Sequence, residues 1–206
     1  MNDCCNDKAC EIEALHGRQR STLLIVLAIN AVMFAVELTA GLLAGSVSLV
    51  ADSLDMLGDA LVYGFSLYVI ARGARMKAMA ALVKGGIMAA FGLFVLGQAV
   101  YRILVPQLPV VEAMGAIGLL ALAANALCLA LLWRHRTDDL NMHSVWLCSR
   151  NDIIANLSVL VAALGVWLAG SGWPDILVGL ALALLFLRSA LQVLRASLAE
   201  LRTARA

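Results

Sequence analysis

Charged residues are scarce in this chain. Of its 206 residues, 14% are Asp, Glu, Lys or Arg, whereas 63% are hydrophobic. A soluble globular domain carries about 25% charged and about 45–50% apolar residues, so this composition is typical of an integral membrane protein. The formal net charge is only +1, and we therefore expect lipid rather than nucleic acid as a partner.

Proline is also scarce, and all three prolines lie in short turns between long apolar runs. Each run can cross the hydrocarbon core as a helix, which takes about 20 residues. The roughly 10-residue alternating segments of a membrane β-barrel are absent from the sequence. We predict an all-α membrane protein, a bundle of six transmembrane helices over residues 23–44, 47–70, 78–104, 110–133, 145–169 and 176–194.

The distribution of Lys and Arg predicts the orientation. These residues gather in the N-terminal segment, the second and fourth loops and the C-terminal tail. Because positive residues stay on the cytoplasmic side, we expect both termini in the cytoplasm, and a multi-pass protein of a bacterial inner (plasma) membrane. The first 20 residues are polar and predict no cleavable signal peptide. The predicted units are a cytoplasmic segment 1–21, a membrane domain 22–198 and a tail 199–206.

Acidic residues inside the predicted spans need an explanation, because an ionisable group at the centre of a membrane helix costs roughly 2.5–3.5 kcal/mol. Asp55 and Asp59 are four residues apart in the second span, and Cys148 and Asp152 have the same spacing in the fifth. That spacing puts each pair on one helical face. With a rise of about 1.5 Å per residue, all four groups fall near the middle of the membrane. We predict that they converge on one site.

Three carboxylates and one thiolate match the ligands of a tetrahedral ion such as Zn²⁺. Without a cation such a set carries up to four negative charges, and protonation removes that cost when the site is empty. Metal binding must then release protons, which gives a physical basis for exchanging metal against protons. The alternative is that the acids pair with one another, or with Arg150 and Lys84, as purely structural contacts.

Two segments resemble signatures of the cation diffusion facilitator family of metal/proton antiporters. Residues 45–59 (GSVSLVADSLDMLGD) are similar to that family's second-span signature, and residues 141–157 to its fifth-span signature. The resemblance extends over roughly 23–198. It implies that Asp55, Asp59, Cys148 and Asp152 bind the metal, with Cys148 at the position of the family's usual His.

This resemblance implies a secondary active transporter, not an enzyme, that needs no cofactor. It would export Zn²⁺ or Cd²⁺, with Co²⁺ as a further candidate, in exchange for protons. The sequence lacks the family's His-rich fourth loop and its common C-terminal cytoplasmic domain, so it resembles a short form. A homodimer through the membrane helices is a further expected partner. The alternatives are a metal importer, and a membrane-embedded sensor or accessory subunit that binds metal without transport.

Asp52 and Asn156 are candidate accessory residues, each one helical turn from a predicted ligand. Asp52 could line the exit or carry a proton, or it could form a hydrogen bond near the membrane surface. Asn156 could orient a ligand or join two helices. Arg150 is two residues from both Cys148 and Asp152 and so points away from their face; we predict Glu37 as its partner.

The N-terminal segment holds Cys4, Cys5 and Cys10. Cytosolic cysteines are more often metal ligands or redox groups than disulfides, and a flexible capture site for a soft cation is one interpretation. A reduced tail with no such role is the other. Two further features have structural interpretations: Cys128 is predicted to pack in the core, and the glycines at 85, 86, 92 and 97 to permit close contact between helices.

Overall fold

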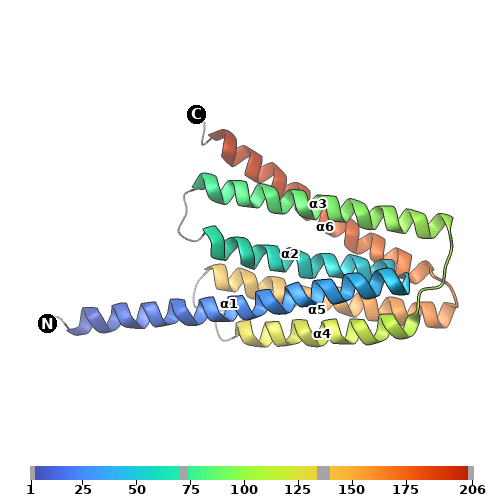
Figure 1. The fold of residues 1–206 in the computed structure, drawn as a ribbon, viewed down its shortest axis with the longest axis horizontal. Coiled ribbons are helices and arrows are strands. Elements are labelled where there is room, and N and C mark those ends of the chain that lie inside the picture. The colour runs from blue at the N-terminus through green and yellow to red at the C-terminus, as the bar shows by residue number, and fades with distance from the viewer. Residues whose placement is uncertain (1–2, 70–73, 134–139, 204–206) are drawn as a thin grey trace.

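The computed structural model describes residues 3–69, 74–133 and 140–203, and it describes their side chains outside 3–19, 65–69, 74–78, 140–151 and 202–203. Within these ranges every regular element is an α-helix (Figure 1). The six helices are α1 (Asp3–Ala44), α2 (Val47–Val69), α3 (Ala74–Leu104), α4 (Val111–Trp133), α5 (Leu140–Ala169) and α6 (Trp173–Thr203). The predicted all-α bundle is confirmed.

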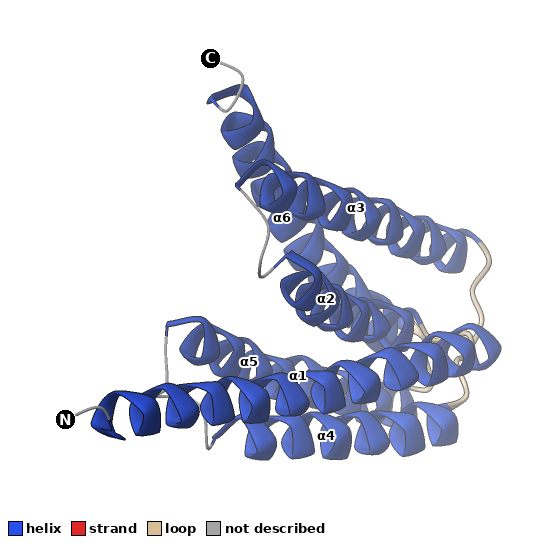
Figure 2. Cartoon of the chain, turned by 60° about the vertical axis from the view of Figure 1, so that its left-hand side comes forward, coloured by secondary structure: helices blue, strands red, loops and turns tan. Residues whose placement is uncertain are grey.

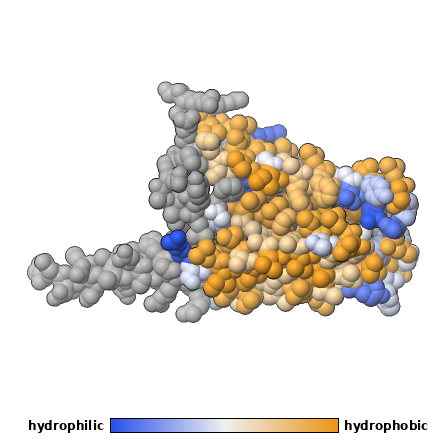
Figure 3. Space-filling model, viewed as in Figure 1, coloured by the Kyte–Doolittle hydropathy of each residue, from blue (hydrophilic) through white to orange (hydrophobic). Residues whose placement is uncertain are grey.

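Five of the six helices are long and apolar enough to cross a membrane by themselves. The exception among the described helices is α2, because its 23 residues include Asp52, Asp55 and Asp59. It packs against α1, α3, α5 and α6, which shields its acidic groups from lipid. The face of the molecule in Figure 3 is largely apolar, and large side chains such as Leu43 and Trp167 are 82% and 68% exposed. Such a surface is expected where lipid, not water, is the solvent.

Both ends of the chain lie at the same end of the bundle (Figures 1 and 2), as an even number of spans requires. Several helices continue past the predicted spans at that end. The longest extension belongs to α1, which begins at Asp3 and projects beyond the other helices (Figure 1). It carries Cys4, Cys5 and Cys10, whose side chains lie outside the described part of the structure.

The turn between α1 and α2 is tight because Gly45 adopts a φ of 70°. Its N–H donates to the carbonyl oxygen of Leu42 at 3.3 Å, and the N–H of Ser46 donates to that of Gly41 at 2.9 Å. This pair of bonds is the Schellman arrangement, in which a glycine takes the left-handed position. The turn therefore ends α1 abruptly and starts α2 one residue after Ser46.

Asp175 of α6 fixes the amino end of α2 across the bundle. Its carboxylate accepts from the N–H groups of Val47 at 2.7 Å and Ser48 at 3.0 Å. It also accepts from the hydroxyls of Ser46 at 2.7 Å and Ser48 at 2.6 Å. The first N–H groups of a helix have no partner within the helix, and a carboxylate there also interacts favourably with the helix dipole. Asp175 is buried. It satisfies the first N–H groups of α2, a role that usually belongs to a capping side chain next to the helix.

Glycines allow close backbone contact at this end of the bundle. A Cβ at Gly179 of α6 would lie 2.6–2.9 Å from atoms of Val47 and Ser48, and one at Gly41 would lie 2.9 Å from the N atom of Val50. Small residues at helix contacts are a general feature of membrane bundles. The prediction that four glycines of α3 permit close contact between helices was right for two of them, because those at 85 and 92 pack on α6. It was wrong for those at 86 and 97, which have no such neighbour within 4 Å among the described residues.

Cys128 is buried in a cluster formed by α1, α2 and α4. Its neighbours there include Val26, Tyr63 and Leu132, and the Nδ2 atom of Asn30 lies 3.8 Å from its Sγ atom. The prediction that this cysteine packs in the core is confirmed. A larger cluster joins the amino half of α2 to α3, α4, α5 and α6.

Replacing Asp175 by Ala should lower the free energy of unfolding by about 2–4 kcal/mol, because several buried donors lose a charged acceptor worth about 1.5–3 kcal/mol each when isolated. Thermal or detergent-induced unfolding of the purified protein measures this. Glu112→Ala, which removes an exposed acid in the first turn of α4, is the control and should change stability by less than about 0.5 kcal/mol. Equal stability of the two variants would contradict the assigned role of Asp175.

Candidate metal centre

Three of the four predicted ligands line one cavity. Asp55 and Asp59 reach it from α2 and Asp152 from α5, and residues of α3 and α6 complete its walls. Its volume is about 660 Å³, far more than a single ion needs. Asp152 is buried, while Asp55 and Asp59 are half-buried. The i,i+4 spacing that placed Asp55 and Asp59 on one face therefore also directs them into one space.

The acidic side chains interact with one another across this space. Asp152 lies within hydrogen-bonding reach of both Asp55 and Asp59, although α5 and α2 are distant in the sequence. The hydroxyl of Tyr63 donates to the Oδ2 atom of Asp59 at 3.0 Å, which orients that carboxylate. Carboxyl groups at such distances need a proton or a cation between them, because like charges in a low-dielectric site repel strongly.

Lys84 brings a positive charge to the same cavity from α3. It interacts electrostatically with Asp59, and it is the sole charged residue between positions 78 and 101 of the sequence. From the sequence, Lys84 was considered only as a structural partner of the acids. Its isolation within an apolar span was the signal for a functional position, because an intramembrane charge normally faces a cavity or a partner.

The fourth predicted ligand, Cys148, lies on α5, one turn before Asp152, and its side chain is outside the described part of the structure. Among the described side chains, no three His, Cys, Asp or Glu residues already enclose a position for a metal ion. The acids stand on the wall of an open cavity instead.

The predicted accessory residues Asp52 and Asn156 contact each other directly. Asn156 donates from Nδ2 to the Oδ2 atom of Asp52 at 2.8 Å, and Asn125 donates from Nδ2 to the Oδ1 atom of Asn156 at 2.9 Å. All three side chains are buried, and the chain of bonds joins α2, α5 and α4. Of the two roles predicted for Asn156, the structure therefore shows the hydrogen bond between helices.

The cavity lies near the middle of the bundle, between the two ends of its helices. Counted along α2, its lining begins eight residues from Val47 and ends at Val62, or about 12–22 Å from the start of the helix. The helices around it spread apart toward the end where both termini lie (Figure 2). At the opposite end the bundle is held closed by the contacts of Asp175 and by a 3.0 Å hydrogen bond from the N–H of Val110 to the carbonyl of Ala44.

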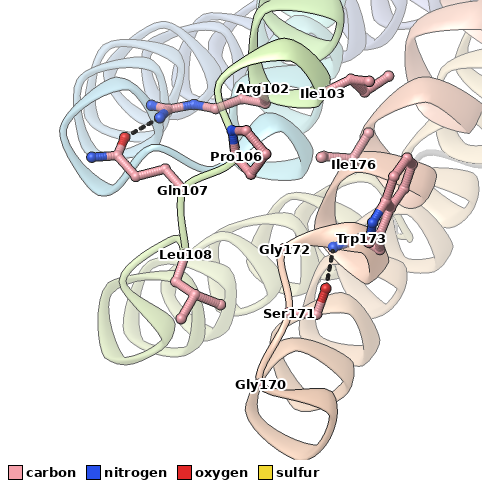
Figure 4. A pocket seen from close by; sticks show the side chains of 10 residues that line it. All are labelled: Arg102, Ile103, Pro106, Gln107, Leu108, Gly170, Ser171, Gly172, Trp173 and Ile176. Carbon is pink, nitrogen blue, oxygen red and sulfur yellow. Dashed lines mark hydrogen bonds between the residues drawn. The ribbon is translucent and has the colours of Figure 1, made fainter.

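A second, smaller cavity of about 230 Å³ lies at that closed end (Figure 4). Arg102 and Gln107, which are hydrogen-bonded to each other, and Trp173 are among its lining residues. None of its lining residues is acidic. A cation therefore has no ligand of the expected type there.

Comparison with known proteins agrees with the helical arrangement. Residues 23–202 match the family model of the cation efflux transmembrane domain. The chain is 28% identical over 193 residues to the zinc transporter ZitB of Escherichia coli (strain K12), and 24% identical over 196 residues to the cadmium, cobalt and zinc/H(+)-K(+) antiporter of Bacillus subtilis (strain 168). These alignments cover 87% and 88% of the chain, but 61% and 63% of the two relatives. The chain thus spans about three-fifths of their length, and they are named as transporters rather than enzymes.

The position of the cavity predicts one-sided access to α5. In a protein whose five native cysteines are replaced by serine, Ser158→Cys should react with a charged, membrane-impermeant maleimide added on the side of the termini. Ser158 lines the cavity, whereas its neighbour Leu157 is 46% exposed on the lipid surface. Leu157→Cys is therefore the matched control and should stay unlabelled. Labelling of both positions, or labelling of Ser158→Cys from the other side, would refute this orientation of the cavity.

Proposed function

This chain belongs to the cation efflux family, and we propose that it is a secondary active transporter that exports divalent transition-metal cations from the cytoplasm in exchange for protons. Asp55, Asp59, Cys148 and Asp152 are the proposed metal ligands. The observation that carries the proposal is the cavity in which carboxylates from α2 and α5 meet. The helices spread apart toward the termini (Figure 2), and the contacts of Asp175 hold the other end of the bundle together.

The proposal explains why this cavity is so acidic. Three carboxylates and a thiolate bind a divalent cation at the depth where hydrocarbon otherwise surrounds the helices, and the cation offsets their desolvation. Lys84 neutralises part of that charge while the site is empty. When metal arrives, protons leave the ligands, so metal and protons compete for the same oxygens and sulfur. A conformational change that opens the closed end then releases the metal on the far side.

The metal preference follows from the chemistry of the ligands. A thiolate favours soft and borderline cations, whereas carboxylates alone suit hard ones. The mixed set therefore favours Zn²⁺ and Cd²⁺, with Co²⁺ as a further substrate. Mg²⁺ and Ca²⁺ are poor substrates, because these ions take oxygen ligands. The names of the relatives, which include zinc, cadmium and cobalt, support this range.

Metal transport should depend on Asp59. In inverted membrane vesicles with an acidic interior, the wild-type protein should accumulate Zn²⁺, and Asp59→Asn should reduce the initial rate at least tenfold while expression is retained. The variant removes a ligand charge but keeps the shape of the side chain. Glu112→Gln is the control, because that acid is exposed at the closed end of the bundle and should transport as the wild type does.

The same assay separates the alternative functions. A sensor or accessory subunit would bind Zn²⁺ without any movement into the vesicles. An importer would move Zn²⁺ out of loaded inverted vesicles. It would not accumulate Zn²⁺ inside vesicles with an acidic interior. Either result, obtained with protein that binds Zn²⁺, would refute export.

The identity of the residue at position 148 should set selectivity. Cys148→Ser keeps the size of the side chain but removes the soft ligand, so the ratio of Cd²⁺ to Zn²⁺ transport should fall several-fold. Cys148→His should retain Zn²⁺ transport and also lower the ratio, because imidazole is a harder ligand than thiolate. Cys128→Ser is the thiol control, since that residue packs in the core. A ratio that does not change in Cys148→Ser would show that the thiolate is not a ligand.

A further inference from the structure

Glu37 of α1 is the least satisfied polar side chain in the described part of the chain. It is fully buried, with 0% of its surface exposed. Both of its carboxylate oxygens lack a hydrogen-bond partner among the described residues. A buried, unpaired carboxylate in the membrane interior is very costly, so this side chain requires a cation or a donor that the other described residues do not supply.

Asp52 also has a carboxylate oxygen without a hydrogen-bond donor. Its Oδ2 atom accepts from Asn156, but its Oδ1 atom has no partner, and the residue is also 0% exposed. Asn156 is held in turn by Asn125, so this amide network fixes the Asp52 carboxylate in one orientation. Glu37 and Asp52 lie close enough to interact electrostatically. Together, the two carboxyl groups have three oxygen atoms that accept no hydrogen bond from the described residues.

The surroundings of this pair exclude most cations. Among the described residues, neither member of the pair lines the 660 Å³ cavity, and neither lines the cavities bordered by Trp173, Gln98 or Arg195. A hydrated or multiply coordinated metal ion needs space and further ligands, whereas a proton needs neither. A proton on either carboxyl group removes its negative charge, and with it most of the cost of burying that group.

The charged groups on the neighbouring helices do not remove this need. α2 presents Asp52 and Asp55 to Glu37, which adds negative charge. α4 has no charged residue between positions 113 and 133. From α5, Asp152 is again acidic, and Arg150, the partner predicted for Glu37 from the sequence, has a side chain outside the described part of the structure.

We propose that Glu37 and Asp52 form a proton-binding site that is separate from the metal cavity, and that the proton bound there is a counter-ion of the exchange. This inference rests on the proposed export function and adds to it. If metal and all protons shared one set of ligands, coupling would come only from direct competition. With a second site, a proton is bound at α1 and α2 while the cavity is empty, and it is released on the cytoplasmic side as metal binds.

Infrared spectroscopy tests whether the proton is present. Zn²⁺ releases protons from the ligands in the cavity and, on this proposal, from Glu37 and Asp52 as well. The carbonyl stretch of protonated carboxylic acid that disappears on Zn²⁺ saturation should therefore be smaller in Glu37→Gln than in the wild type, and unchanged in Glu112→Gln. An equal loss in Glu37→Gln and the wild type would overturn the proposal, and it is the result expected if Arg150 balances an ionised Glu37.

Two modes of transport test whether the proton is a counter-ion. Uptake of Zn²⁺ driven by a pH gradient requires proton movement, whereas exchange of labelled for unlabelled Zn²⁺ at equal pH does not. Glu37→Gln should reduce the gradient-driven rate at least tenfold more than the exchange rate. Equal losses in both modes, or no loss in either, would show that the pair has a structural role only.

Asp52→Asn provides a second variant if Glu37→Gln does not fold, since the new amide oxygen can still accept from Asn156. It should show the same selective loss. The wild type separates this inference from the proposed function: wild-type protein that moves no Zn²⁺ in either mode refutes export itself. Wild-type protein that moves Zn²⁺ in both modes, with both variants losing the two modes equally, refutes only the separate proton site.

Discussion

The carboxylate of Asp175 fixes the amino end of α2, and the positions of the three acidic residues of that helix depend on these hydrogen bonds. It accepts hydrogen bonds from two backbone N–H groups and two serine hydroxyls. In a membrane these groups have no water as an alternative partner. Gly179 brings the backbone of α6 against the same segment. With this end held, Asp52 and Asp55 are set at fixed positions along the interior of the bundle.

The helix with the most acidic residues inside the predicted spans, α2, is also the one that packs against the most neighbours. Five helices have an apolar surface sufficient for a membrane, and α2 packs against four others. Its acidic residues divide between two environments. Asp55 and Asp59 border a large cavity, while Asp52 is enclosed by hydrogen bonds and packed side chains. A single helix thus places two acidic groups at the wall of a cavity and encloses a third among packed side chains.

Features set by local chemistry were predictable from the sequence. The number of helices follows from the length of the apolar runs, and the shared face of Asp55 and Asp59 follows from helical periodicity. Features that depend on which helices become neighbours were not. The bonds of Asp175 join residues more than 120 positions apart, and nothing in the apolar run of α3 distinguishes Gly85, which packs on α6, from Gly86, which does not. The cavity-facing position of Lys84 is different, because its isolation within an apolar run was a signal that the sequence did contain.

The close contacts at the amino end of α2 also determine how that helix can move. Backbone held against backbone at Gly41 and Gly179 leaves little room for sliding, but it permits rotation about the contact. Asp59 lies twelve residues beyond Val47, or about 18 Å along the helix axis. A tilt of about 10° at this pivot would displace Asp59 by about 3 Å, more than the roughly 2.0–2.3 Å length of a zinc–ligand bond. A small change of angle at the amino end of α2 would therefore be enough to move Asp59 into or out of bonding distance of an ion at the proposed site.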